Sequence, residues 1–329
     1  MAMEYSTLGA SRLRVSRLAL GTATFGVAPT AADVNALVAA ALDLGINFFD
    51  TANSYGNQST FDRARQPSAN ERESAESLLG RALRGPINQV AVASKVGEPL
   101  GSNREKHPFV GCLTRDHIKE QAHRSLERLG TDRIDLYYAH LPDPTTELAE
   151  TIGAFNELID EGLIGEWAIS NYSARQTAEV VATAERCAMR SPVANQVSYH
   201  LANRSIEIDS LPEVTEAARV ALVAYGPLGG GLLAGSAELS QDYAGNRRWG
   251  GAGFSASDVR QATAFEWLAG EWGIKPARLA LAWLLGRRNV ACAVLGTTSQ
   301  ERLASACSAV DLDLSDEQLV ALDEIAHRQ

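Results

Sequence analysis

Several apolar runs of the chain end on a polar side chain that can carry chemistry. Three consecutive runs end at Asp50, Lys95 and His140. Polar residues are common at strand ends because the chain leaves the core there. That reason alone does not account well for an Asp, a Lys and a His that can act together. We therefore expect these groups to form one ring around one pocket. The next three runs end near Ser170 and Asn171, at Gln196 and at Tyr225.

Tyr55 lies five residues past Asp50, a spacing that lets its hydroxyl stand over the mouth of that pocket. The ordinary pKa of tyrosine, ~10, is too high for easy proton transfer at neutral pH, and a nearby ammonium lowers it. Lys95 can supply the ammonium, and Asp50 can keep it charged in a buried site. His140 can donate a hydrogen bond to a carbonyl oxygen. The four residues suit a general acid with an oxyanion stabiliser, as carbonyl reduction requires.

The segments that must position these residues alternate between strand-like and helix-like patterns. Eight strands alternating with helices, without a composition break, predict an α/β fold, the (β/α)8 TIM barrel, as a single domain over residues 1–329. The predicted strands are Leu18–Leu20, Ile46–Phe49, Val90–Ala93, Ile134–Tyr138, Glu166–Ile169, Val193–Gln196, Val220–Ala224 and Cys292–Leu295. The predicted helices are Thr30–Leu44, Glu73–Leu83, Arg115–Leu129, Leu148–Glu161, Ala174–Arg186, Ser257–Trp272, Pro276–Leu285, Gln300–Ala309 and Ser315–Ala326.

The segments outside this alternation have their own expected places. Glu4–Leu8 and Leu13–Val15 predict an N-terminal β-hairpin that caps the barrel floor. Three connections, residues 57–72, 97–113 and 234–256, exceed the usual loop length of ~2–6 residues. All three follow strands, so we expect them on the C-terminal face, where barrel enzymes keep their active sites.

The bulk properties limit the class of protein. The chain has 329 residues, and its net charge of -10 argues against nucleic acid or an anionic membrane as the main partner. Its four cysteines form no CxxC pair, and we expect neither a disulfide framework nor a metal site. No stretch approaches the ~18 apolar residues of a membrane span, and Met1–Leu20 lacks a signal-peptide core. A cytoplasmic location is the expectation, with homo-oligomer formation left open.

Five motifs, in this order, resemble those of the aldo-keto reductase superfamily over nearly the whole chain. Any one of them is weak, but the five together are specific. They are Gly45-Ile46-Asn47-Phe48-Phe49-Asp50-Thr51-Ala52-Asn53-Ser54-Tyr55-Gly56, Ala93-Ser94-Lys95-Val96-Gly97, Arg124–Leu129 leading into Asp132–His140, Gly165–Tyr172, and Tyr225–Leu233.

The resemblance implies a catalytic tetrad and a nicotinamide cofactor. The tetrad would be Asp50, Tyr55, Lys95 and His140, with Tyr55 as the proton donor when hydride passes from nicotinamide C4 to a carbonyl carbon. Ser170, Asn171 and Gln196 would hold the carboxamide, and Tyr225 would stack on the nicotinamide ring. The expected cofactor contacts are Gly21, Thr22, Asp50, Ser170, Asn171, Gln196, Tyr225, Gly226, Pro227, Leu228, Gly230, Gly296, Thr298 and Arg302.

The phosphate groups of such a cofactor need a binding place other than the usual dinucleotide fingerprint. The chain has no G-x-G-x-x-G between an early strand and helix, which excludes a Rossmann dehydrogenase. The turn Gly226–Leu233 can offer backbone N–H groups to a pyrophosphate. Arg302, in Gly296–Arg302 at a helix N-terminus, suits a ribose 2′-phosphate and so favours NADPH. The chain lacks the basic residue that many members carry near Gly296 or Thr298 and has Ser305-Ala306 in place of Glu-Asn, so NADH stays an alternative.

Substrate choice is expected to depend on the pocket walls. Phe25 and Trp249, with Tyr55 and His140, are the candidate substrate contacts, and Phe61 and Phe109 are further apolar walls. An anionic or sugar-like substrate is a second hypothesis, set against the simpler reading of solvated loop charges. It rests on Arg63, Arg65, Arg104, Lys106, Arg247 and Arg248.

Two rival functions use the same fold. One is a nucleotide-binding sensor or channel-associated regulatory subunit with little turnover, against which the intact set of four residues speaks. The other is a metal-dependent barrel hydrolase, which needs ligands at several strand ends, whereas only Asp50 and His140 are so placed.

Overall fold

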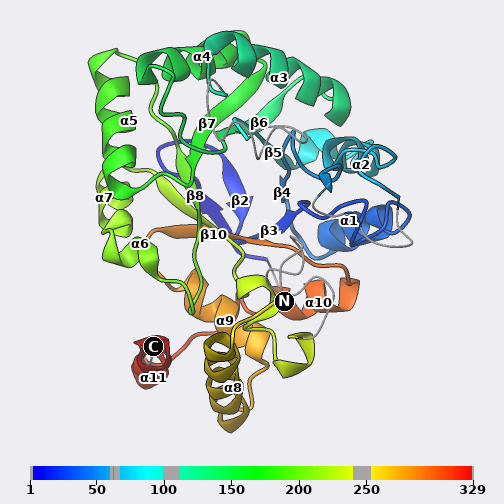
Figure 1. The fold of residues 1–329 in the computed structure, drawn as a ribbon, viewed down its shortest axis with the longest axis vertical. Coiled ribbons are helices and arrows are strands. Elements are labelled where there is room, and N and C mark those ends of the chain that lie inside the picture. Colours follow the sequence, from blue (N-terminus) through cyan, green and yellow to red (C-terminus); the bar gives the residue numbers. More distant parts are fainter. Residues whose placement is uncertain (1–2, 60–61, 63–66, 99–111, 240–252, 328–329) are drawn as a thin grey trace.

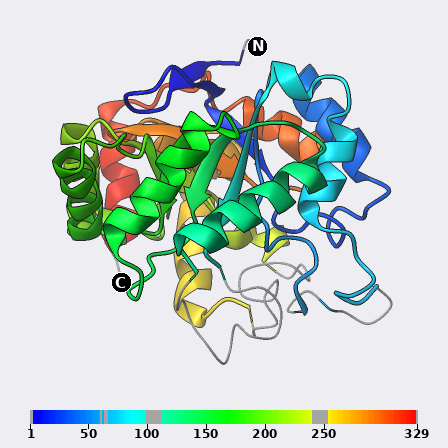
Figure 2. The same ribbon diagram turned by 90° about the horizontal axis from the view of Figure 1, so that it is seen from above.

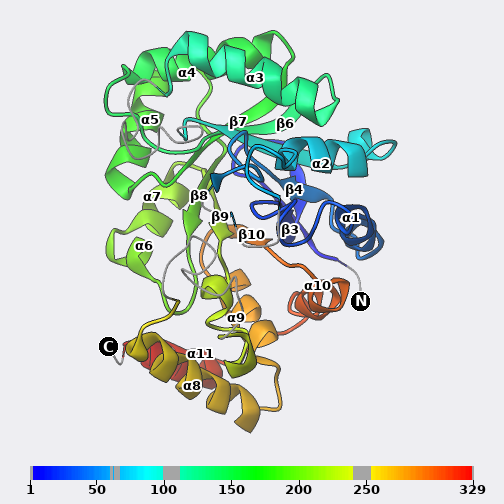
Figure 3. The ribbon, with the colours of Figure 1, turned by 45° about the vertical axis from the view of Figure 1, so that its right-hand side comes forward.

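Eight parallel strands close into a barrel with helices around it, which confirms the predicted fold class. The computed structural model describes residues 3–59, 62, 67–98, 112–239 and 253–327. Around the barrel the strand order is β10-β3-β4-β5-β6-β7-β8-β9, and Figures 1 and 3 show the helices outside it. The strands are β3 (Leu18–Gly21), β4 (Phe48–Asp50), β5 (Ala91–Val96), β6 (Ile134–Ala139), β7 (Ile164–Ser170), β8 (Ala194–Ser198), β9 (Ala221–Tyr225) and β10 (Val290–Leu295).

Side chains along each strand alternate between two apolar layers. On β5, Ala91 and Ala93 belong to the cluster inside the barrel, whereas Val92 belongs to the layer between barrel and helices. On β6, Leu136 and Tyr138 face inward in the same way. Because successive side chains of a strand point to opposite sides, a strand residue two positions beyond an inward one also faces inward. This alternation sets the direction of the polar residues at the strand ends.

The helices lie close to their predicted positions, with two exceptions. Helix α1 begins at Val34 and not at Thr30, because Thr30 pairs with Gly26 in a bridge and accepts a turn hydrogen bond from Asp33. Two short helices between β8 and β9, α6 and α7, were not predicted. The helices are α1 (Val34–Asp43), α2 (Ala75–Ala82), α3 (Arg115–Leu129), α4 (Leu148–Asp160), α5 (Ala174–Arg186), α6 (Ser205–Ile208), α7 (Leu211–Ala217), α8 (Ala256–Glu271), α9 (Pro276–Leu285), α10 (Gln300–Cys307) and α11 (Asp316–His327), with short 3-10 turns η2 (Ile87–Gln89), η4 (Gly229–Gly231) and η5 (Ser236–Glu238).

An antiparallel hairpin closes one end of the barrel, as the sequence predicts. Its strands are β1 (Tyr5–Thr7) and β2 (Arg14–Ser16), shown in dark blue across one end of the barrel in Figure 2. Leu8 and Val15 are fully buried and join the cluster inside the barrel. The hairpin therefore completes the core at the N-terminal ends of the strands and leaves the opposite end for a pocket.

In the described part of the connection between β4 and α2, a buried arginine makes several polar contacts. Arg72, just before α2, is only 8% exposed. Its guanidinium forms an ion pair with Asp62 at 2.8 Å and donates to the backbone oxygens of Gly56 and Gln58. This arginine therefore fixes the beginning of the connection that carries Tyr55. Among the described helices, none combines the length and apolar character that crossing a membrane requires.

Candidate active site

The inward-facing rows of the strands end on polar residues at one end of the barrel. On β4, Phe48 is part of the inner cluster, and Asp50, two residues later, faces the same way. On β5, Ala93 is followed in the same manner by Lys95, and on β6, Tyr138 by His140. The same rule applies to Ser170, Gln196 and Tyr225, which follow Ala168, Ala194 and Val223 on β7, β8 and β9.

Lys95 and Asp50 form a buried ion pair beneath the pocket. The ammonium of Lys95 lies 2.5 Å from Oδ1 of Asp50 and donates a second hydrogen bond to the carbonyl of Thr51 at 2.9 Å. The other carboxylate oxygen of Asp50 accepts from the amide of Gln196 at 2.7 Å. Burial lowers the pKa of Lys95, while the charge of Asp50 opposes that change by favouring the ammonium.

Tyr55 and His140 meet above this ion pair. The Tyr55 hydroxyl lies 3.5 Å from Nε2 of His140, and the two rings are arranged edge to face. The ammonium of Lys95 lies 4.8 Å from the centre of the Tyr55 ring. The structure thus brings the four predicted catalytic residues together, with a phenol and an imidazole nitrogen facing the same space and a cation beside the phenol.

The residues expected to hold a carboxamide form a connected hydrogen-bond network beside this group. Asn171, in the left-handed backbone region at φ 64°, donates to the carbonyl of His140 at 3.1 Å. Its side-chain oxygen accepts from the Tyr225 hydroxyl at 2.9 Å. Ser170 donates to the carbonyl of Gln196 at 2.9 Å. Burial raises the pKa of the Tyr225 phenol, which keeps it a hydrogen-bond donor at neutral pH.

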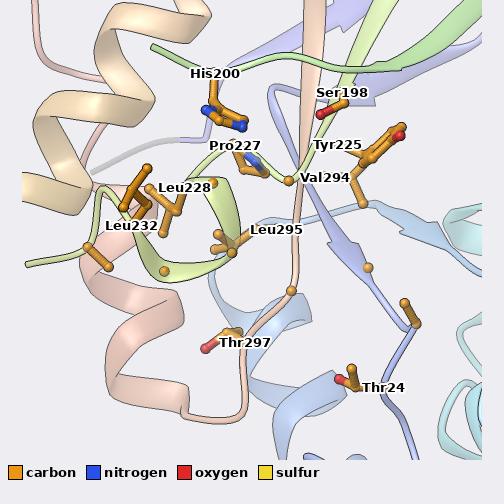
Figure 4. A pocket seen from close by; sticks show the side chains of 18 of the residues that line it. Thr24, Ser198, His200, Tyr225, Pro227, Leu228, Leu232, Val294, Leu295 and Thr297 are labelled. Carbon is orange, nitrogen blue, oxygen red and sulfur yellow. The ribbon is translucent and has the colours of Figure 1, made fainter. Parts of the chain in front are cut away.

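One large cavity, of about 1090 Å³, joins these groups to the turn after β9 and to the region before α10. Lys95 is fully buried below it and does not line it. Figure 4 shows Tyr225 at the end of β9, Pro227 and Leu228 in the segment that follows it, and Thr24 and Thr297 in other segments of the wall. The cavity wall includes all the residues expected to contact a cofactor: Gly21, Thr22, Asp50, Ser170, Asn171, Gln196, Tyr225, Gly226, Pro227, Leu228, Gly230, Gly296, Thr298 and Arg302.

The end of the cavity near α10 is lined by charged residues, most of which the sequence did not indicate. Arg302 forms an ion pair with Glu238 at 2.9 Å, and its side chain is 54% exposed. Asp258 and Lys275 also line the cavity, at the beginnings of α8 and α9. Both helices were predicted, but nothing in their periodicity showed that their first residues face a pocket.

Two buried polar atoms in the cavity wall suggest that it is shaped for a ligand. Oγ1 of Thr22 and Nδ1 of His200 have no hydrogen-bond partner among the described residues. A buried polar group without a partner is costly, so such groups usually await a ligand or water. His200 lies against the turn after β9, where a Cβ on Gly229 would come within 3.4 Å of its ring (Figure 4). Gly229, Gly230 and Gly231 all have positive φ, and as glycines they leave the turn without side chains. These features fit a dinucleotide with a polar diphosphate.

The expectation for Phe25 is wrong. Its side chain is fully buried in the apolar layer between the barrel and helices and does not line the described cavity. A tight turn, in which the amide of Phe25 donates to the carbonyl of Thr22, separates this residue from the pocket wall. Other expected walls and loop charges lie outside the described residues: Phe61, Arg63, Arg65, Arg104, Lys106, Phe109, Arg247, Arg248 and Trp249.

Glu98 is a pocket residue that the sequence reasoning missed. It is 7% exposed, lines the cavity and accepts a hydrogen bond from Ser54 at 2.5 Å. Its carboxylate also lies 3.6 Å from Nδ1 of His140. The only sequence signal was its place three residues after Lys95, which does not distinguish it from a solvated loop carboxylate.

A metal ion does not suit the carboxylate at the centre of the site. Both oxygens of Asp50 already accept hydrogen bonds, one of them from a cation. Within the part of the chain that the structure describes, no group of three or more His, Cys, Asp and Glu side chains is arranged to hold a metal.

Comparison with known proteins agrees with this architecture over most of the chain. A sequence model described as the Aldo/keto reductase family matches residues 17–327. The "Uncharacterized oxidoreductase YrpG" of Bacillus subtilis is 33% identical over 326 residues, which cover 98% of this chain and 96% of that protein. The "Protein tas" of Escherichia coli is 30% identical, with 98% and 97% covered. A "Probable voltage-gated potassium channel subunit beta" of rice is 30% identical, with 94% and 92% covered.

Proposed function

The chain belongs to the aldo/keto reductase family of oxidoreductases, and from that premise we propose that it reduces an aldehyde or ketone to an alcohol with NADPH. The observation that carries the proposal is the convergence of Asp50, Tyr55, Lys95 and His140 at the inner end of one cavity. The substrate in this proposal is a small carbonyl compound, and the whole chain acts as a single barrel domain.

In this proposal Tyr55 is the proton donor. Its hydroxyl gives a proton to the carbonyl oxygen of the substrate as the carbonyl carbon becomes an alcohol carbon. The ammonium of Lys95, beside the Tyr55 ring, favours the phenolate that remains. Asp50 keeps Lys95 charged, and His140 donates a hydrogen bond that aligns and polarises the carbonyl.

The same cavity offers the contacts that a nicotinamide dinucleotide needs. When bound, a reduced nicotinamide supplies the hydride for the carbonyl carbon. In this proposal Ser170, Asn171 and Gln196 hold the carboxamide and Tyr225 stacks on the ring. All four residues line the cavity, and the Tyr225 hydroxyl donates a hydrogen bond to Asn171. The glycine turn after β9 would receive the diphosphate, for which His200, beside that turn, has a polar atom without a described partner.

The preference for NADPH over NADH rests on Arg302. A guanidinium pairs strongly with a phosphate, and Arg302 lines the cavity in the first turn of α10. Glu238 already pairs with Arg302. A ribose 2′-phosphate would therefore have to share the guanidinium with the Glu238 carboxylate or displace that carboxylate. NADH use is the alternative if the Glu238 pair is retained.

A second candidate function follows from the names of two relatives. Proteins of rice and Arabidopsis thaliana, both 30% identical to this chain, are named as probable β subunits of a voltage-gated potassium channel. A nucleotide-binding regulatory subunit with little turnover would use the same barrel and cavity. The four converging catalytic side chains favour the enzyme over this alternative.

A cofactor-consumption assay separates the two candidates. NADPH absorbance is followed with a panel of aldehydes and ketones, and binding of NADPH is measured separately by protein fluorescence. The proposal predicts consumption of NADPH that depends on the carbonyl compound. Tight binding without consumption across the panel would favour the regulatory subunit, and absence of NADPH and NADH binding would contradict both.

A further inference from the structure

We propose that Glu98 is a positioning residue for His140: it holds the imidazole with a proton on Nδ1, so that Nε2 donates to a substrate carbonyl only when the ring is doubly protonated. This inference rests on the proposed function for its consequence in catalysis. Its structural part, the proton position on His140, can be tested without turnover.

The contacts of Glu98 place a fixed charge behind the histidine ring. Oε2 of Glu98 lies 3.6 Å from Nδ1 of His140, an ion-pair distance that is longer than a direct hydrogen bond. The same oxygen accepts a 2.5 Å hydrogen bond from Ser54, which lies one residue before Tyr55. Glu98 and His140 are 7% and 9% exposed, so water screens their interaction only weakly. The carboxylate is therefore held beside Nδ1, while Nε2 faces the Tyr55 hydroxyl.

The chemistry of a carboxylate determines which nitrogen carries the proton. An ionised carboxylate only accepts hydrogen bonds, whereas neutral imidazole has one donor and one acceptor nitrogen. Glu98 therefore favours a proton on Nδ1, which leaves Nε2 as an acceptor in the neutral ring. Nε2 is the nitrogen that lies 3.5 Å from the Tyr55 hydroxyl. In the neutral state His140 can only accept there, and it becomes a donor to a carbonyl oxygen once the ring gains its second proton.

The charges of other described ionisable groups near His140 add to the effect of Glu98. From β4 and the segment after it come Asp50 and Tyr55, from β5 Lys95, and from β9 Tyr225. The positive charge of Lys95 disfavours a protonated imidazole. The negative charge of Asp50, whose Oδ1 lies 2.5 Å from the Lys95 ammonium, offsets that charge. Among these groups, Glu98 is the carboxylate that stands next to the histidine ring. Its charge also contributes to raising the pKa of Tyr225 and opposes the lowering of the pKa of Lys95.

The direct test is the protonation state of His140 in the wild-type protein. Nitrogen-15 NMR of the imidazoles, assigned with a His140→Gln sample, distinguishes the two neutral tautomers. We expect the Nδ1–H form above the titration midpoint of His140. A predominant Nε2–H form would overturn the inference, whatever the enzyme does with substrates.

A Glu98→Gln variant tests whether the charge of Glu98 acts on His140. The amide keeps the size of the side chain and an acceptor for Ser54 but removes the charge. We expect the His140 midpoint to fall by about one pH unit or more, and the alkaline limb of kcat/KM for carbonyl reduction to move to lower pH by the same amount. At a pH well below the variant's midpoint, its kcat/KM should approach that of the wild type.

Two controls separate charge from packing. Glu98→Asp keeps the charge and should retain most of the wild-type pH profile. Glu166→Gln changes a partly buried carboxylate on β7 that does not line the described cavity, so its profile should equal that of the wild type. An unchanged His140 midpoint in Glu98→Gln would contradict the inference. If the wild type shows the expected Nδ1–H form of His140 but reduces no carbonyl compound, that result would count against the proposed function alone.

Discussion

His200 is a half-buried histidine that the fold keeps neutral. Burial lowers the pKa of its imidazole from 6.5 to about 4. The ring lies against the glycine turn after β9, and its Nδ1 has no hydrogen-bond partner among the described residues. A group with this behaviour opposes folding in acid, because the unfolded chain binds its proton more tightly than the folded chain does.

The free energy of unfolding should therefore fall as the pH falls from 6.5 toward 4. The folded-state pKa of His200 is below the unfolded value, so the stabilisation is complete above about pH 6.5 and is lost on the way to about pH 4. The gap corresponds to about 3 kcal/mol. A His200→Asn variant, which cannot titrate there, should lose about 3 kcal/mol less than the wild type over this range in urea unfolding.

A histidine at the surface provides the control for this prediction. His123 is exposed on α3, and His123→Asn should leave the pH dependence of unfolding as it is in the wild type. Equal losses of stability in the wild type and His200→Asn would show that the burial of His200 has no such effect.

At the residue scale, the sequence indicated the strand-end residues better than the loop residues. Asp50, Lys95 and His140 were found because each follows an apolar run, and period-two alternation then sends all three to the barrel mouth. Glu98 and Phe25 lie just after strands, where no periodicity tells whether a side chain turns toward the pocket or away from it. Only the folded backbone shows that Glu98 faces His140 and that Phe25 faces the helices.

At the element scale, the two ends of the barrel have different tasks. The hairpin β1–β2 closes the N-terminal end with Leu8 and Val15. The C-terminal ends of the strands and the connections after them form the cavity wall. In barrel enzymes generally, residues at the first end support stability and residues at the second support catalysis.

Truncating the hairpin core should therefore reduce stability and leave activity unchanged. Leu8→Ala removes a fully buried side chain and should lower the free energy of unfolding by about 2–5 kcal/mol. Below the unfolding temperature, kcat and KM should stay within about twofold of the wild type. Val320→Ala, at a 59% exposed position of α11, should change stability by less than about 0.5 kcal/mol. A large loss of kcat in folded Leu8→Ala would contradict this division of tasks.

The long helices could be predicted because their apolar periodicity is sustained. Helices α3, α5 and α9 match their predicted residue ranges. Helices α6 and α7 span only four and seven residues, too few turns for an apolar periodicity to stand out, and they were missed. Helix α7 packs against α5 and β9, and α6 packs against α7, which are contacts that a single sequence does not reveal.

At the scale of the whole molecule, the cavity joins distant parts of the chain. Its wall runs from Gly21 at the end of β3 to Ala306 in α10. The Arg302–Glu238 ion pair links α10 to the turn η5 across its outer end. A ligand that occupies this cavity should therefore stabilise the whole fold and not one segment.

NADPH at one hundred times its Kd should raise the free energy of unfolding by about 2.7 kcal/mol. For a chain of 329 residues this corresponds to a rise in Tm of roughly 4 °C. Arg302→Met removes the expected partner of the 2′-phosphate and should raise the Kd for NADPH about ten- to a hundredfold. The Kd for NADH should change much less, and calorimetry measures both.

Arg288 offers a matched control for that substitution. Its side chain is 56% exposed against 54% for Arg302, and it also pairs with a glutamate, Glu216. Because it does not line the described cavity, Arg288→Met should leave both Kd values unchanged. Equal weakening of NADPH and NADH in Arg302→Met would remove the argument for NADPH preference.

Removal of the Tyr55 hydroxyl tests whether Tyr55 supplies the proton in carbonyl reduction. Tyr55→Phe keeps the ring beside Lys95 and removes the hydroxyl that faces His140. With a carbonyl compound that the wild type reduces, kcat for NADPH oxidation should fall by about 10²–10⁴-fold, while the Kd for NADPH changes by less than about twofold. A Tyr55→Phe protein that retains kcat within about tenfold of the wild type would contradict the proposed mechanism.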